Sequence, residues 1–131
     1  MTGFGPGVVL DASAVLAWLF GELGSEIVDP MLAGAVLSTV NLAEVWQKLD
    51  DRGADADRTL RRLRLLGLRT QPFSDDDAAR AAGLWRTGRR VGLSLGDRCC
   101  LALASRLRVP AVTADRSWGE IDLPVEVRVI R

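Results

Sequence analysis

Short apolar segments alternate with longer amphipathic ones along the whole chain, and this alternation limits the possible folds more than any other feature. The apolar segments are predicted strands and cover residues 8–11, 35–39, 68–72, 109–113 and 125–130. The segments between them are predicted helices and cover residues 14–20, 25–32, 41–52, 57–66, 74–90 and 94–107. This order favours an α/β fold, with a central parallel sheet of four to five strands flanked by helices on both faces.

The pattern runs without a linker or repeat and predicts one domain over residues 1–131. Its two cysteines, Cys99 and Cys100, are adjacent. Consecutive Cα atoms lie about 3.8 Å apart, closer than the roughly 4.4–6.8 Å that a disulfide usually spans. We therefore expect reduced thiols and a cytoplasmic protein. No apolar stretch approaches the ~20 residues needed to cross a bilayer, and no basic segment typical of a signal peptide precedes the first strand.

The charge balance argues against a generic nucleic-acid binder, because 17 basic residues offset 17 acidic ones. All the basic residues except Lys48 are arginine, which suits bidentate phosphate contacts. Arginines gather at residues 58–69 and 86–90. An apolar stripe accompanies the first group, so a solvated helix face is the favoured interpretation and an RNA track the alternative. The second group is interpreted in the same way.

Four acidic residues stand next to predicted strands or in the first turns of predicted helices. Asp11 and Asp115 each come at or just after the end of a strand. Glu44 and Asp97 each lie in the first predicted turn of a helix. Because ligands of parallel sheets bind beyond the carboxyl ends of the strands, these elements can direct all four carboxylates to one point.

Each acid also has a purely structural interpretation. Asp11 and Asp115 can cap the turns that follow them. Glu44 and Asp97 both have the spacing of a capping box, with Asn41 and Ser94 as the capping residues. Taken together, however, four acids in such places favour a shared function.

The chemistry of that function follows from the ligand type. The chain contains no histidine, and oxygen ligands alone suit hard cations, Mg²⁺ or Mn²⁺. Clustered carboxylates repel one another, so we expect raised pKa values without the metal. A cation of this kind commonly works on phosphate substrates, and phosphodiester hydrolysis is therefore the predicted reaction.

Four sequence blocks carry a resemblance to a known family. They are residues 9–14 (VLDASA), 41–45 (NLAEV), 93–98 (LSLGDR) and 112–118 (VTADRSW). In this order, over nearly the whole chain, they resemble the PIN-domain ribonucleases, and among these the VapC-type toxins of bacterial toxin–antitoxin pairs. The resemblance implies a PIN-like three-layer domain.

It also implies an endoribonuclease dependent on Mg²⁺ or Mn²⁺, a homodimer, and a cognate antitoxin that blocks the site. The residues that the resemblance assigns to the metal and to catalysis are Asp11, Glu44, Asp97 and Asp115, with Ser13 and Thr113 as polar support. Arg98 and Arg116 directly follow two of the acids and are candidate RNA-binding residues. Glu120 and Asp122 are interpreted as surface acids.

Two alternatives stay open at this point. One is a PIN-type nuclease that processes RNA or DNA without acting as a toxin, and the other is a catalytically silent binding module. The four tryptophans, at positions 18, 46, 85 and 118, are interpreted mainly as core residues. Trp18 and Trp46 lie on helices that flank the predicted site and can line a groove for an antitoxin helix.

Overall fold

The computed structural model describes residues 7–131, so the first six residues of the predicted domain lie outside the described part. Its five strands are β1 (Val8–Leu10), β2 (Ala35–Ser38), β3 (Arg69–Gln71), β4 (Ala111–Thr113) and β5 (Val127–Val129). They form one parallel sheet in the order β3-β2-β1-β4-β5. The chain thus builds outward from β1 to one edge and then returns to the other side of β1.

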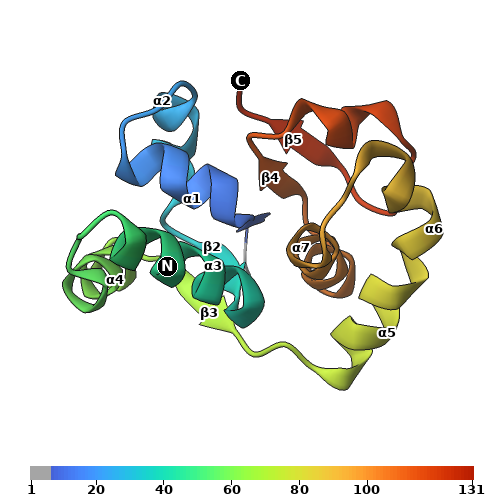
Figure 1. Cartoon of the computed structure of the whole chain (residues 1–131), viewed down its shortest axis with the longest axis horizontal. Helices are drawn as coiled ribbons and strands as arrows, with labels where there is room; N and C mark the ends of the chain where they lie inside the picture. Colours follow the sequence, from blue (N-terminus) through green and yellow to red (C-terminus); the bar gives the residue numbers. More distant parts are fainter. Residues whose placement is uncertain (1–6) are drawn as a thin grey trace.

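Helices cover this sheet on both faces (Figure 1). The α-helices within residues 7–131 are α1 (Ala12–Leu19), α2 (Ser25–Val28), α3 (Thr39–Asp51), α4 (Ala56–Leu65), α5 (Asp75–Gly83), α6 (Trp85–Gly88) and α7 (Leu95–Leu107). Three short 3₁₀ helices are η1 (Asp29–Met31), η2 (Arg89–Val91) and η3 (Arg116–Glu120). The expected three-layer α/β arrangement is confirmed.

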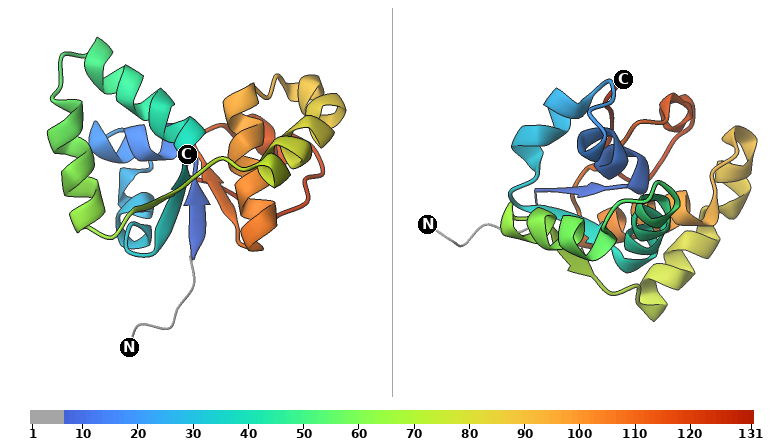
Figure 2. Two further views of the ribbon diagram at one scale, coloured as in Figure 1. Left: turned by 90° about the horizontal axis from the view of Figure 1, so that it is seen from below. Right: turned by 60° about the vertical axis from the view of Figure 1, so that its left-hand side comes forward.

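The two layers of core follow the alternation of side chains along the strands. Val8 and Leu10 of β1 pack in a core cluster with residues of α1 to α4, whereas Val9 packs on the other face with α7. The turned views show α1 to α4 on one side of the molecule and α5 to α7 on the other (Figure 2). Every residue of β1, β2 and β4 is buried, as expected for strands covered on both faces.

The outer strands differ from the inner ones. The edge strands β3 and β5 each have three residues, and their side chains are exposed or only partly buried. Each carries an arginine, Arg69 on β3 and Arg128 on β5. None of the helices within residues 7–131 is long and apolar enough to span a bilayer.

One predicted helix is divided in the structure. Residues 74–90 form α5, α6 and η2 in place of a single helix. Leu84 separates α5 from α6, and the chain leaves the helical conformation at Gly92, whose φ of 73° is left-handed. Gly88 lies against Leu93: an added Cβ would come within 3.0–3.3 Å of that side chain. Proline similarly divides the predicted helix at 25–32 into α2 and η1, because Pro30 has no N–H to donate.

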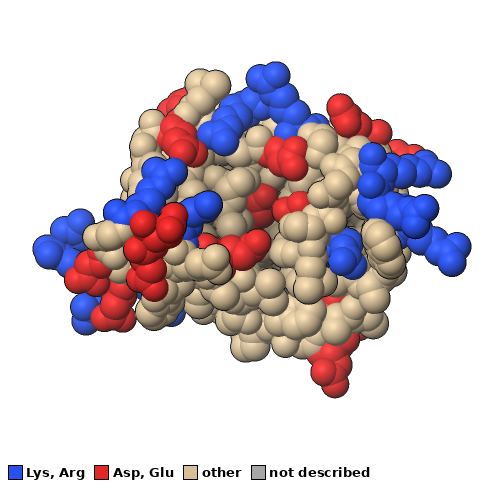
Figure 3. All heavy atoms as spheres, in the orientation of Figure 1, with Lys and Arg blue, Asp and Glu red and all other residues tan. Residues whose placement is uncertain are grey.

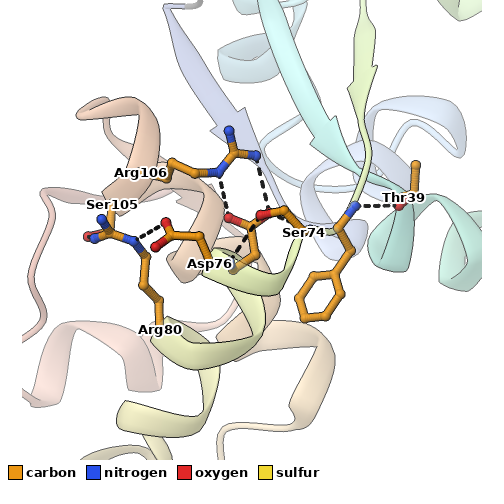
Figure 4. Close-up of polar contacts among 8 residues, drawn as sticks. Thr39, Ser74, Asp76, Arg80, Ser105 and Arg106 are labelled. Atoms are coloured by element: carbon orange, nitrogen blue, oxygen red, sulfur yellow. Dashed lines mark hydrogen bonds and ion pairs between the residues drawn. The ribbon is translucent and has the colours of Figure 1, made fainter.

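Polar contacts join α5 to α7 on one face of the sheet (Figure 4). Arg106 of α7 binds the buried Asp77 of α5 through two hydrogen bonds, of 2.6 and 3.2 Å. Arg80 binds both Asp76 and Ser105, so a second arginine joins the helices. These contacts hold α7 in place, and α7 begins at the carboxyl edge of the sheet.

Candidate active site

Asp11 occupies the point where the strand order reverses. It follows β1 and caps α1, and its residue surface is only 3% exposed. One carboxylate oxygen accepts hydrogen bonds from the Ala14 amide (2.8 Å) and the Ser13 hydroxyl (2.7 Å). The other accepts the Thr113 hydroxyl at 2.6 Å. The carboxylate is therefore fixed in orientation by three donors.

The strand register explains why Thr113 reaches Asp11. Leu10 pairs with Val112 across β1 and β4, which brings the next residue of each strand side by side. The Thr113 hydroxyl also accepts the Asp115 amide at 3.0 Å, and the Ser13 hydroxyl accepts the Ala114 amide at 2.9 Å. The two hydroxyls thus connect Asp11 to the backbone that leads to Asp115.

Asp97 and Asp115 both lie on turns that begin helices at this edge. Asp97 forms a complete capping box with Ser94, with bonds of 2.9 and 3.1 Å. Asp115 caps η3 and accepts the Ser117 amide at 2.9 Å. The capping interpretation is correct for Asp11, Asp97 and Asp115, and it leaves one oxygen of Asp97 and one of Asp115 outside these bonds.

Glu44 lies on α3. The structure starts this helix at Thr39, with Ser38 as its cap, so Glu44 belongs to the second turn. Asn41, which the sequence suggested as a cap, instead lies inside the helix. Its buried amide donates to Glu44 (2.7 Å) and to the Gly96 carbonyl on α7 (3.0 Å). Sequence reasoning missed this positioning role, although Asn41 stands inside the NLAEV block.

Gly96 is the second residue that the sequence did not single out. A Cβ at this position would come within 2.5–2.7 Å of the Glu44 carboxylate. Glycine therefore lets α3 and α7 approach closely enough for Glu44 to lie beside the first turn of α7, which carries Asp97.

The electrostatics of the acids depend on one another. Burial raises the pKa of Asp11 from 3.8 to about 6, despite its three hydrogen bonds, and the charge of Asp97 adds to the shift. Burial also raises the pKa of Asp97, with a smaller contribution from Asp115. These mutual effects show that the carboxylates are close enough to influence one another's charge. Figure 3 shows acidic side chains gathered in a hollow in the middle of this face of the molecule.

The donor set fits a hard divalent cation by its chemistry, because it consists of carboxylate and hydroxyl oxygens. Positive charge would also relieve the repulsion between Asp11, Asp97 and Asp115. As the side chains stand, no group of three or more acidic or cysteine residues within 7–131 is arranged to hold an ion.

The two candidate RNA-binding arginines occupy different surroundings. Arg98 is half-buried, and it donates to the Ala81 carbonyl at 2.9 Å. Its guanidinium carbon lies 6.0 Å from the centre of the Trp85 ring. Arg116 is exposed and donates to the carbonyl of Arg131 at 2.8 Å. Glu120 and Asp122 are exposed, as surface acids are.

A family model described as PIN domain matches residues 8–123, which is most of the chain. The chain belongs to the PIN-domain family. Its fold is also similar to those of several solved structures. A toxin–antitoxin complex from Klebsiella pneumoniae matches with a TM-score of 0.71 and 19% identity, over 92% of this chain and 99% of the other.

Two further solved structures give similar values. VapC20 of Mycobacterium tuberculosis, described as a Sarcin-Ricin loop cleaving toxin, matches with a TM-score of 0.70 and 17% identity, over 92% of this chain and 99% of the other. DNA-bound VapBC from Salmonella typhimurium matches with a TM-score of 0.69 and 14% identity, over 96% and 99%. No curated protein matches the sequence. The expected PIN fold is thus confirmed over nearly the whole length of these neighbours.

Proposed function

We propose that this PIN domain is an endoribonuclease that depends on Mg²⁺ or Mn²⁺ and acts as the toxin of a toxin–antitoxin pair. The observation that carries the proposal is the group of four acids at the carboxyl edge of the sheet, where Asp11 and Asp97 have raised pKa values. The similarity to structures of toxin–antitoxin complexes and to a Sarcin-Ricin loop cleaving toxin supports both parts of the proposal.

The residues divide into those that hold the ion and those that orient them. The ion would be held by Asp11, Glu44, Asp97 and Asp115. Ser13 and Thr113 keep both oxygens of Asp11 in a fixed direction, and Asn41 holds one oxygen of Glu44. When bound, Mg²⁺ or Mn²⁺ supplies charge that stabilises phosphoryl oxygens and favours the ionisation of water.

The antitoxin part of the proposal is supported by a groove along α3. Its lining residues are Thr39, Leu42, Ala43, Trp46, Gln47 and Asp50. Trp46 is 39% exposed in this groove and offers an aromatic anchor for an amphipathic helix of the partner. Trp18, on the neighbouring helix α1, donates its indole N–H to the Asp29 carboxylate. A homodimer and a cytoplasmic location complete the proposal, the latter supported by two free, buried cysteines.

Cleavage of total cellular RNA tests the proposal, with Mg²⁺, with Mn²⁺ and with a chelator. We expect discrete fragments in either metal and none in the chelator. Asp97→Asn should abolish cleavage but keep the fold, because the amide oxygen can still accept the Ser94 N–H of the capping box. Asp122→Asn, at an exposed acid outside the site, should cleave like the wild type.

A further variant separates the charge of Asp97 from its capping role. Ser94→Ala removes the hydroxyl that accepts the Asp97 amide and should lower stability by about 1 kcal/mol. It keeps the carboxylate, so its RNA cleavage should stay close to that of the wild type. If Asp97→Asn cleaves RNA at the wild-type rate, the proposed site is wrong. If only DNA is cut, or if a co-expressed antitoxin candidate leaves cleavage unchanged, the nuclease has no toxin role.

A further inference from the structure

A half-exposed tryptophan lies among arginines on α6 and η2. Trp85, Arg86, Arg89 and Arg90 together line one surface hollow. Trp85 keeps 52% of its surface exposed, whereas Trp118 is fully buried in the core. The expectation of a core residue is therefore correct for Trp118 and wrong for Trp85. An exposed indole ring needs a reason, because burying it is normally favourable.

Two guanidinium groups lie over the ring. The guanidinium carbon of Arg89 lies 5.5 Å from the ring centre, and that of Arg98 lies 6.0 Å from it. Arg98 is itself anchored by its bond to the Ala81 carbonyl. These contacts orient the indole ring in advance, and half of its surface still faces solvent. Arg90 also lines a second hollow with Glu120 and Asp122, so Arg86 and Arg89 are the arginines least offset by acids.

This arginine–tryptophan patch adjoins the candidate active site. Arg98, which contacts the ring, is the residue after Asp97 in the first turns of α7. The short segment from η2 to Ser94 connects the patch to the same capping box. Figure 3 shows basic side chains gathered at the edge of the face whose centre holds the acids, over the region where Figure 1 places α6.

The chemistry of the patch matches unpaired RNA better than it matches a duplex. Single-stranded nucleic acid is recognised by stacking bases on aromatic rings and by arginine contacts to phosphates. In a duplex the base faces are covered by their neighbours and cannot stack on Trp85. The protein has no net charge, so attraction for phosphate has to come from local groups such as these.

We propose that Trp85, Arg86 and Arg89 form a subsite that stacks an unpaired base of the RNA substrate and binds its phosphate beside the acids. This inference rests on the proposed ribonuclease function. The subsite would select single-stranded or looped RNA and would place the adjoining phosphodiester bond toward the hollow.

Binding by the full chain in the non-cleaving Asp97→Asn background tests the subsite. The probe is a fluorescently labelled 12-nucleotide RNA in Mg²⁺, either single-stranded or annealed to its complement. We expect Trp85→Leu to weaken single-strand binding roughly 5- to 150-fold, the range for loss of one stacked base. Trp85→Phe keeps an aromatic ring and should stay within about threefold. Duplex binding should change little in both variants.

Arginine variants test the phosphate contact separately. Arg89→Gln should weaken binding and reduce its dependence on salt concentration. Arg64→Gln removes an exposed arginine from α4, on the other side of the molecule, and should leave both unchanged (Figure 1).

Equal RNA binding by Trp85→Leu and the parent protein would overturn the subsite. Equal losses of affinity in the Leu and Phe variants would also overturn it, as would equal losses of affinity for single-stranded and duplex RNA in Trp85→Leu. Loss of antitoxin binding in place of RNA binding would assign the patch to the protein partner. The ribonuclease proposal and the subsite proposal fail separately. If the wild type does not cleave RNA, the ribonuclease proposal is wrong. If the wild type cleaves RNA and Trp85→Leu does not change RNA binding, only the subsite proposal is wrong.

Discussion

Replacing Asp11 by asparagine should make the metal-free protein more stable at neutral pH. Asp11 is 3% exposed, and burial raises its pKa from 3.8 to about 6. A difference of about two pKa units corresponds to about 3 kcal/mol of lost folding stability at pH values above both. The neutral amide avoids this cost. It also loses the hydrogen bond from Thr113, and this loss offsets about 1 kcal/mol of the gain in stability. We therefore expect a net gain of about 2 kcal/mol.

The gain should depend on pH in a defined direction. Because the pKa of Asp11 is higher in the folded protein, the folded state binds more protons between pH 3.8 and about 6. The stability of the wild type therefore falls as the pH rises through this window. The variant lacks this term. The stability advantage of the variant should be full near pH 8 and shrink as the pH falls below 6. It should reverse near pH 4, where the wild type no longer buries a charge and still has the hydrogen bond from Thr113.

Urea titrations in chelator at pH 8, 6 and 4 measure this directly, with Asp122→Asn as the control. Equal m-values would show that the midpoints report stability alone. Adding Mg²⁺ at pH 8 should reverse the order, since a bound ion stabilises the wild type and not the variant. A variant less stable than the wild type in chelator at pH 8 would refute the reasoning. It would mean that the hydrogen bonds outweigh the cost of burying the charge.

Two further substitutions test contacts between helices. Gly96→Ala should lower RNA cleavage at least tenfold, because the added methyl group pushes the Glu44 carboxylate aside. Its unfolding free energy should stay within about 1 kcal/mol of the wild type, since alanine favours helix. Unchanged cleavage would contradict this role of Gly96. Arg106→Gln should cost about 3 kcal/mol at pH 7, because the fully buried Asp77 loses its charged partner. Burial acts to raise the pKa of Asp77, but Arg106 and Ser74 hold it below 3.8. The loss should therefore shrink in thermal melts below pH 3.8, and a variant as stable as wild type at pH 7 would contradict it.

The sequence pattern was sufficient for the sheet and for the placement of Asp11 and Asp115. A buried strand with period-two packing on both faces leaves a continuous apolar run, and such a run is easy to recognise. The acid that ends each run then falls at the carboxyl edge. Capping positions were equally readable, because the spacing of Ser94 and Asp97 reports a local hydrogen-bond pattern.

Features that depend on distant packing could not be read in this way. Ser38 and Asn41 are both good capping residues, and only the position of Gly96 on α7 makes Asn41 an interhelical donor. The exposure of Trp85 likewise depends on the break between α5 and α6 and on how α5 packs against α7. Helical periodicity continues across this break, so the pattern alone predicted one helix with a buried tryptophan.

The edges of the sheet limit how any partner can approach. A partner that adds a strand needs a free edge long enough for several backbone hydrogen bonds, and such edges also promote self-association. Here both edges have three residues, and each carries an arginine whose charge disfavours a docked strand. Recognition is thereby directed to the helices and to the hollow between them. The same arrangement disfavours association between copies of the molecule through the sheet.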